Sequence, residues 1–321
     1  MTDAPIKHEY DPSNLDKPSL SVVEARDVVK KYGSKLALNS VSFTIEPGSV
    51  FALLGENGSG KTTTARLILG EMKPTSGQMR VFQLDPVKYA SSVRPRVGYI
   101  PEAPRLYEYM TVGQLGRFAA AFNFKGYWSE YAQRCEELGL NLNARVRTLS
   151  KGMKAKTSLA LELARDPEIL VLDEPTSGLD ALVRRQILSN VADLAAAGKA
   201  VFLSSHQTAE VERVADHVAF LKNGKFILMD SVENIKETTK LLSATIRGDS
   251  AGDASLDALF ASIFEDEYIG KERYGARYHL LGRGLSPNYE ERLRTALGER
   301  LVDTSLSIPT LEDVFIAYMK K

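Results

Sequence analysis

One octapeptide of this chain combines residue types and spacing that bind the phosphates of a nucleotide. Its sequence, GENGSGKT, fits the pattern G-x-x-x-x-G-K-[ST] without a mismatch. Glycines let the backbone wrap closely round a phosphate with its N–H groups directed inward, and Lys61 adds a full positive charge. We therefore expect a nucleoside triphosphate as the ligand. The members of this phosphate loop are Gly55, Glu56, Asn57, Gly58, Ser59, Gly60, Lys61 and Thr62.

The segments on either side of the phosphate loop support this interpretation. Residues 49–54, SVFALL, form a short apolar run typical of a buried strand, and residues 63–72, TTARLILGEM, have the apolar spacing of a helix. A strand before the loop and a helix after it are the context that the motif requires, which argues against a chance match in a glycine-rich turn. In this arrangement Thr62 is placed to bind Mg²⁺ through its hydroxyl, and Thr63 to reach the α-phosphate.

Three further polar side chains follow apolar strand-like segments. ILVLDE ends in Asp173 and Glu174, and VFLSS leads directly to His206. Ligands of parallel α/β sheets bind where the strands end, so we expect all three beside the nucleotide. The first carboxylate would anchor the metal, the second would polarise an attacking water, and the imidazole would donate a hydrogen bond to the γ-phosphate. Such residues are often structural when they occur alone, and their position after a matched phosphate loop favours catalysis.

Composition limits the setting in which this site works. Lys plus Arg and Asp plus Glu both number 41 in 321 residues, so the net charge is zero and a nucleic-acid partner gains no electrostatic support. The single cysteine, Cys135, cannot form an intramolecular disulfide, and the N-terminus lacks a signal-peptide pattern. We therefore expect a reducing, cytoplasmic setting. No apolar run approaches the roughly 18 residues that span a bilayer, so the chain alone is not expected to cross a membrane.

The pattern along the chain indicates three regions. Residues 1–19 are polar, contain three prolines and lack periodicity, and we expect a disordered tail. Residues 20–236 contain two β segments before the phosphate loop, a helical insertion over about 89–165, and then the buried strands EILVLDE, AVFLSSH and HVAFLKNG with helices between them. Residues 237–321 alternate strand-like and amphipathic segments, which predicts a small α/β accessory domain.

Taken together, GENGSGKTT, LSKGM, ILVLDEPTSGLD and SSH resemble the ATP-binding subunit of ABC transporters over roughly residues 20–236. The expected fold class is α/β, a P-loop NTPase core with an N-terminal antiparallel β subdomain and a helical insertion, plus the small C-terminal domain. LSKGM resembles the family's signature, which implies that two such domains meet head to tail with each ATP between one phosphate loop and the other's signature. Ser150 and Gly152 then open a helix whose amides face the γ-phosphate, and Ser150 is also a good N-cap.

Other positions match the family with lower specificity. Tyr32 in KKYGSKLAL resembles the aromatic residue that stacks on adenine, although a loop tyrosine is also commonly only packed. Asp180 in SGLD resembles the residue that couples the two sites of the dimer, and it also suits an N-cap. Glu102 stands where the family usually has a metal-binding Gln, and Lys151 replaces the first glycine of the signature. The Glu102 loop and the ending PTLEDVFIAYMKK resemble an exporter branch of the family.

The resemblance implies an Mg²⁺-dependent ATPase that dimerises and drives a separate integral membrane permease, for export, at the cytoplasmic face of the cell membrane. One chain carries both halves of the site, which implies a homodimer, while a heterodimer with a degenerate partner stays open. The alternative is a soluble ABC ATPase acting on ribosomes or DNA, but those members typically carry two such domains or a long coiled coil. This chain has one signature and no sustained heptads. A third alternative, a P-loop kinase or GTPase, is disfavoured because such enzymes do not need the signature LSKGM.

Overall fold

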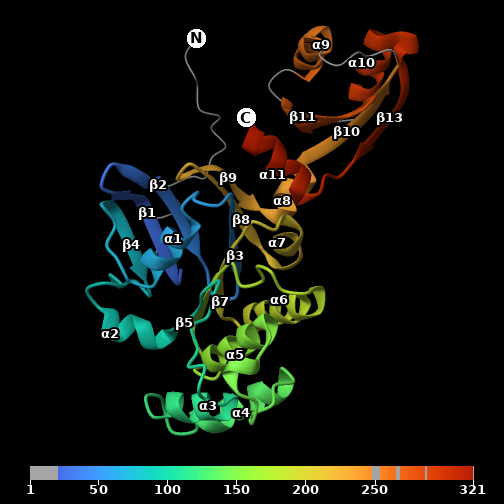
Figure 1. Cartoon of the computed structure of the whole chain (residues 1–321). Helices are drawn as coiled ribbons and strands as arrows, with labels where there is room; N and C mark the ends of the chain where they lie inside the picture. Colours follow the sequence, from blue (N-terminus) through green and yellow to red (C-terminus); the bar gives the residue numbers. More distant parts are fainter. Residues whose placement is uncertain (1–20, 248–253, 265–267, 286–287, 321) are drawn as a thin grey trace.

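The computed structural model describes residues 21–247, 254–264, 268–285 and 288–320, arranged in three sheets with their covering helices (Figure 1). The tail predicted for residues 1–19 lies outside the described residues. The C-terminal sheet stands at one end of the molecule and the helical insertion at the other, with the central sheet between them.

The central sheet has six strands in the order β5-β6-β7-β3-β8-β9, and every neighbouring pair is parallel except β8 with β9. Helices or the second sheet cover both faces, which explains why its inner strands read as continuous apolar runs. The mainly parallel sheet is confirmed. Its strands are β3 (Val50–Gly55), β5 (Val97–Ile100), β6 (Ile169–Asp173), β7 (Ala200–Ser205), β8 (His217–Lys222) and β9 (Lys225–Ser231).

A three-stranded antiparallel sheet packs against one face of the central sheet and confirms the predicted N-terminal β subdomain. The rings of Phe43 and Phe51 stack at 5.0 Å between the two sheets, and Phe202 continues the stack at 6.4 Å from Phe51. Helix α1 packs into the same hydrophobic cluster as β3. The phosphate loop is therefore fixed by β3 at its start and by α1 at its end. These elements are β1 (Val23–Tyr32), β2 (Lys35–Ile45), β4 (Ser76–Val81) and α1 (Lys61–Ile68).

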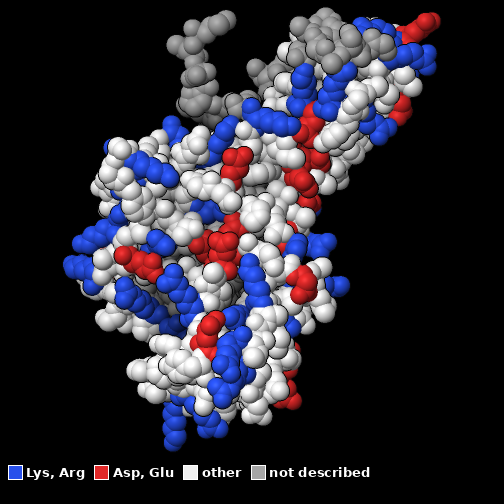
Figure 2. All heavy atoms as spheres, in the orientation of Figure 1, with Lys and Arg blue, Asp and Glu red and all other residues white. Residues whose placement is uncertain are grey.

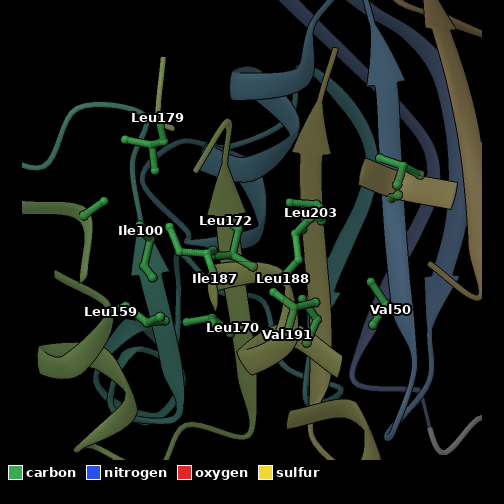
Figure 3. Close-up of a cluster of buried hydrophobic side chains, with 14 of the residues drawn as sticks. Val50, Ile100, Leu159, Leu170, Leu172, Leu179, Ile187, Leu188, Val191 and Leu203 are labelled. Carbon is green, nitrogen blue, oxygen red and sulfur yellow. The ribbon is translucent and has the colours of Figure 1, made fainter. Parts of the chain in front are cut away.

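The other face of the central sheet is covered by helices (Figure 3). Leu170 and Leu172 of β6 and Leu203 of β7 lie against Ile187 and Leu188 of α6. Full burial of each such side chain contributes about 1.5–3 kcal/mol. The packing fixes the ends of β6 and β7, from which the catalytic candidates extend. The helices that cover this face and its margins are α5 (Lys151–Leu163), α6 (Ala181–Ala196) and α7 (Thr208–Val214).

The segment 89–165, predicted to be helical, also contains strand β5 at the edge of the central sheet, so that prediction was incomplete. The segment does contain helices, as predicted. In the insertion, Gly116 of α3 faces Tyr131 of α4 so closely that a Cβ on the glycine would lie 2.0 Å from the ring. The Tyr131 hydroxyl donates to the Val112 carbonyl at 3.0 Å, which locks the two helices together. The remaining helices of this region are α2 (Ala90–Val93), α3 (Val112–Ala120) and α4 (Tyr127–Glu137).

The C-terminal unit has its own hydrophobic core and a four-stranded antiparallel sheet in the order β11-β12-β10-β13. Strand β11 was not predicted. The last helix, α11, returns to the central sheet (Figure 1). There Phe315 and Tyr318 lie edge-on to Phe220 of β8. No helix in the described part of the chain is long and apolar enough to cross a membrane. The elements are α8 (Val232–Thr238), β10 (Thr239–Ile246), α9 (Ala254–Phe264), β11 (Tyr268–Tyr274), β12 (Arg277–Arg283), α10 (Asn288–Leu297), β13 (Leu301–Ser307) and α11 (Leu311–Lys320).

Candidate active site

The phosphate loop joins buried strand β3 to the first turn of α1. Gly58 and Gly60 have φ of +82° and +121°, a region that favours glycine, and a Cβ on Gly60 would lie 2.6 Å from the Ala37 carbonyl oxygen. Lys61 is only 6% exposed, and its Nζ donates to the carbonyl oxygens of Gly55 at 2.6 Å and Glu56 at 3.2 Å. An ammonium group and a helix N-terminus therefore converge in one loop, which suits a polyphosphate.

Asp173 and Glu174 sit at the end of β6, as expected, and are both buried. Ser204 of the adjacent strand holds both residues. Its hydroxyl donates to Asp173 Oδ1 at 2.6 Å, and its carbonyl oxygen accepts from the Glu174 N–H at 3.1 Å. Glu174 has φ +51°, a left-handed conformation that costs a residue with a Cβ about 1–2 kcal/mol. The sequence did not indicate the role of Ser204, although a polar serine pair ending the apolar segment VFLSS was a signal.

The structure brings Lys61, Glu174 and His206 together. Glu174 Oε1 lies 3.1 Å from Lys61 Nζ, and Glu174 Oε2 lies 2.7 Å from His206 Nδ1. The side chains of Lys61 and Glu174 are 6% and 9% exposed, so their contact forms largely out of water, where charge interactions are strong. The His206 side chain is 47% exposed, so its contact with Glu174 lies at the surface. Tyr99 on β5 stands nearby, and burial, with a smaller contribution from the Asp173 charge, raises its pKa to about 12, so its phenol stays neutral.

A cavity of about 320 Å³ opens beside the phosphate loop. Tyr32 is 44% exposed at this cavity, with Lys30 Nζ 5.4 Å from the centre of its ring. The sequence did not identify Lys35 and Ala37 as lining residues, although they follow Tyr32 closely in the chain. The lining residues are Tyr32, Lys35, Ala37, Asn57, Gly58, Gly60, Lys61, Thr62, Thr63, Glu102 and Glu174.

The oxygen ligands proposed for Mg²⁺ come from three elements. Thr62 and Glu102 line the cavity, and Asp173 is buried at the end of β6. Glu102 Oε1 accepts a hydrogen bond from Ser177 Oγ at 3.3 Å. Hydroxyl and carboxylate oxygens are ligands that Mg²⁺ prefers. Within the described ranges no three His, Cys, Asp or Glu side chains are grouped as a metal site. Mg²⁺ commonly keeps several waters and binds substrate phosphates beside one or two carboxylates.

Ser150, Gly152 and Asp180 do not line this cavity. Ser150 Oγ accepts from the Met153 N–H at 3.2 Å and caps α5, and Asp180 Oδ1 accepts from the first N–H groups of α6 at 3.1 and 3.0 Å. Both predicted N-caps are therefore present. A Cβ on Gly152 would lie 3.0 Å from Val183, so the beginnings of α5 and α6 pack side by side. Lys151 is exposed and extends over the loop before Asp180.

Three comparisons place this geometry among known proteins. A family model described as "ABC transporter" matches residues 38–177. A fluoroquinolones export ATP-binding protein of Mycobacterium tuberculosis is 33% identical over 237 residues, covering 72% of this chain and 78% of that protein. An uncharacterized ABC transporter ATP-binding protein of Nostoc is 31% identical over 322 residues, covering 95% of this chain and 92% of that protein. The solved structure of an ATP binding subunit of an ABC transporter aligns with a TM-score of 0.63 at 30% identity, covering 68% of this chain and 92% of its own.

Proposed function

Because this chain belongs to the ATP-binding subunits of ABC transporters, which couple ATP hydrolysis to transport, we propose that hydrolysis takes place at the Lys61–Glu174–His206 site. The observation that carries the proposal is the buried Glu174 carboxylate, held between an ammonium and an imidazole at the edge of a cavity beside the phosphate loop. This carboxylate is the general base that polarises the attacking water.

The remaining side chains have separate roles in this proposal. Lys61 binds the β- and γ-phosphates, His206 donates to the γ-phosphate, and Tyr32 stacks on the adenine. Mg²⁺ would be held by Thr62, Asp173 and Glu102, and its charge would neutralise phosphate oxygens. Phosphates compete with Glu174 for Lys61, so binding of ATP frees the carboxylate to accept a proton.

We also propose that the active form is a head-to-tail homodimer. Ser150 is exposed at the N-terminus of the 13-residue helix α5, and it does not line the cavity of its own chain. The amides of Ser150 and Gly152 would face the γ-phosphate of ATP bound to the partner. Asp180 begins the adjacent helix α6 and would couple the two sites. A helix N-terminus with its cap in place needs little rearrangement to accept an anion.

The helical insertion carries exposed aromatic side chains that fit a membrane permease as the transport partner. Tyr107, Tyr109, Phe118 and Phe122 form a run of contacts with ring centres 5.3–5.8 Å apart. Phe122 is 76% exposed. Contiguous exposed aromatics of this kind mark interaction sites. We propose that the permease docks here, at the cytoplasmic face of the membrane, and that transport is export, as named for the mycobacterial relative.

The alternative, action on ribosomes or DNA, finds less support. Figure 2 shows Lys and Arg interspersed with Asp and Glu over the visible face, rather than a field of one sign. A polyanion is attracted by clustered positive charge, which this face does not present.

The test is to purify the full tagged chain from its native membranes in mild detergent and to identify its partners by mass spectrometry. We expect a stoichiometric multi-spanning membrane protein. The Phe122→Glu variant should no longer co-purify with that membrane protein. The control variant Tyr274→Glu, at an exposed aromatic residue of the C-terminal unit, should still co-purify with it. Recovery with ribosomal or DNA-repair proteins instead would overturn the transport partner.

A further inference from the structure

Glu210 on α7 is a buried carboxylate with no role in the site described above. It is 5% exposed, and burial raises its pKa. Its Oε2 accepts a hydrogen bond from Thr176 Oγ1 at 2.5 Å, and its Oε1 forms an ion pair with Arg184 Nε at 3.1 Å. Among the described residues, neither of the ion-paired atoms has a hydrogen-bond partner. Each therefore depends on the other for compensation of its charge.

Arg184 of α6 extends this contact to two segments of the active site. Its Nη1 donates to Gln207 Oε1 at 2.8 Å, and its Nη2 donates to the Leu179 carbonyl oxygen at 3.1 Å. Gln207 directly follows His206, and Leu179 directly precedes Asp180. The planar guanidinium of Arg184 thus connects α7, through Gln207 and Glu210, to the loop that precedes Asp180. A lysine lacks this rigid fork of donors and could not make these contacts together.

We propose that the Arg184–Glu210 pair positions the catalytic groups, by tying the segment that follows Glu174 to the segment that follows His206. Thr176 is two residues beyond the base, and its hydroxyl is fixed by Glu210. The pair touches neither Lys61 nor the cavity, so it acts through Glu174 and His206 rather than on the nucleotide. This inference rests on the proposed role of Glu174.

Loss of the Arg184–Glu210 pair should therefore lower the rate of ATP hydrolysis without changing the affinity for ATP. When ATP takes Lys61 and His206 as partners, Glu174 loses the two contacts that hold it in the structure described here. The Thr176–Glu210–Arg184–Gln207 connection does not involve the phosphates and stays in place. Misplacement of a catalytic group by 1 Å lowers turnover by about 100-fold, whereas binding at the phosphate loop is unaffected.

The experiment compares single-turnover hydrolysis and ATP dissociation constants for the full chain and its variants. Glu210→Gln keeps the size and the Thr176 contact but removes the charge, and we expect turnover to fall by about 10- to 100-fold with the dissociation constant within about 2-fold. The double variant Arg184→Met/Glu210→Leu removes both charges, which commonly restores stability. We expect its turnover to stay low. The control is Glu168→Gln, which removes the charge of an exposed carboxylate paired with Arg96, at the opposite end of β6 from Glu174.

A purely structural pair would behave differently. In that case turnover would recover in the double variant together with its thermal stability, and this result would overturn the proposal. Wild-type turnover in Glu210→Gln would overturn it as well. If Glu210→Gln does not fold, the turnover rate of the double variant still tests the proposal. Glu174→Gln run in parallel tests the underlying site: if its turnover collapses while the Arg184 and Glu210 variants remain active, the positioning role fails and the proposed function stands.

Discussion

Replacing Glu174 with glutamine tests the catalytic site most directly, because the amide keeps the shape of the carboxylate and removes its charge. In the structure the carboxylate lies 3.1 Å from Lys61 Nζ and 2.7 Å from His206 Nδ1. Glutamine can still contact both groups, so the backbone at the end of β6 should not move. The variant can no longer take a proton from water.

The size of the effect follows from that loss. General-base catalysis contributes about 10²- to 10⁴-fold, which corresponds to roughly 3–5.5 kcal/mol of activation free energy. Binding should be equal or tighter, because Lys61 no longer has to leave an anionic partner when phosphate arrives. Without nucleotide, Lys61 is left buried beside a neutral amide, and breaking a buried pair costs up to about 3–5 kcal/mol. Its two carbonyl contacts offset part of that cost.

Three measurements on one preparation check this reasoning. Single-turnover phosphate release gives the hydrolysis rate, titration with a fluorescent ATP analogue gives the dissociation constant, and thermal unfolding with and without ATP gives the stability. We expect slow hydrolysis, undiminished affinity, a lower melting temperature without nucleotide and a larger rise on adding ATP. Glu168→Gln, at an exposed carboxylate paired with Arg96, is the control. Hydrolysis within about 3-fold of wild type would refute the general-base assignment, since general-base loss predicts at least a 100-fold change.

Three other substitutions separate binding, assembly and packing. Lys61→Ala removes charge-assisted hydrogen bonds worth about 1.5–3 kcal/mol, so ATP affinity measured by titration should fall about 10- to 100-fold, and an unchanged affinity would contradict the phosphate-loop assignment. Ser150→Arg should abolish hydrolysis while the monomer binds ATP normally, because Ser150 is proposed to face the ATP of the partner. If the monomer lost ATP binding as well, that placement of LSKGM would be wrong. Gly116→Ala puts a Cβ 2.0 Å from the Tyr131 ring and should lower the free energy of unfolding by about 1–3 kcal/mol in a denaturant titration. If that energy does not change, Tyr131 moves aside without cost.

Features encoded by neighbouring residues could be predicted from the sequence. The phosphate loop is contiguous, and its geometry depends on glycines at fixed positions, such as Gly60 with φ +121°. The caps at Ser150 and Asp180 are equally local, because a side chain bonds to an amide two or three residues ahead. The convergence of Glu174 and His206 was also predictable, since the carboxyl ends of parallel strands share one edge.

Features that depend on distant partners were missed. Strand β5 has four residues, VGYI, which show no alternation, and its Gly98 packs against Leu170 of the neighbouring strand. Strand β11, YIGKERY, is largely polar, and pairing with β12 makes it a strand. The Arg184–Glu210 pair joins two helices whose charged residues look like an ordinary solvated face in the sequence. Only the fold shows that Glu210 is buried.

The contacts around Glu174 imply an order of events during turnover. Both groups that hold its carboxylate, Lys61 and His206, are also the groups expected to bind phosphate, so phosphate and the carboxylate would compete for the same two partners. Arrival of the γ-phosphate would release the carboxylate at the moment when a substrate is present to react. A released carboxylate needs another constraint to stay aligned, and the described contacts that remain are Ser204 on the backbone side and the Arg184–Glu210 pair through Thr176. In the proposed mechanism, the nucleotide that frees the base is therefore also what makes the Arg184–Glu210 pair necessary.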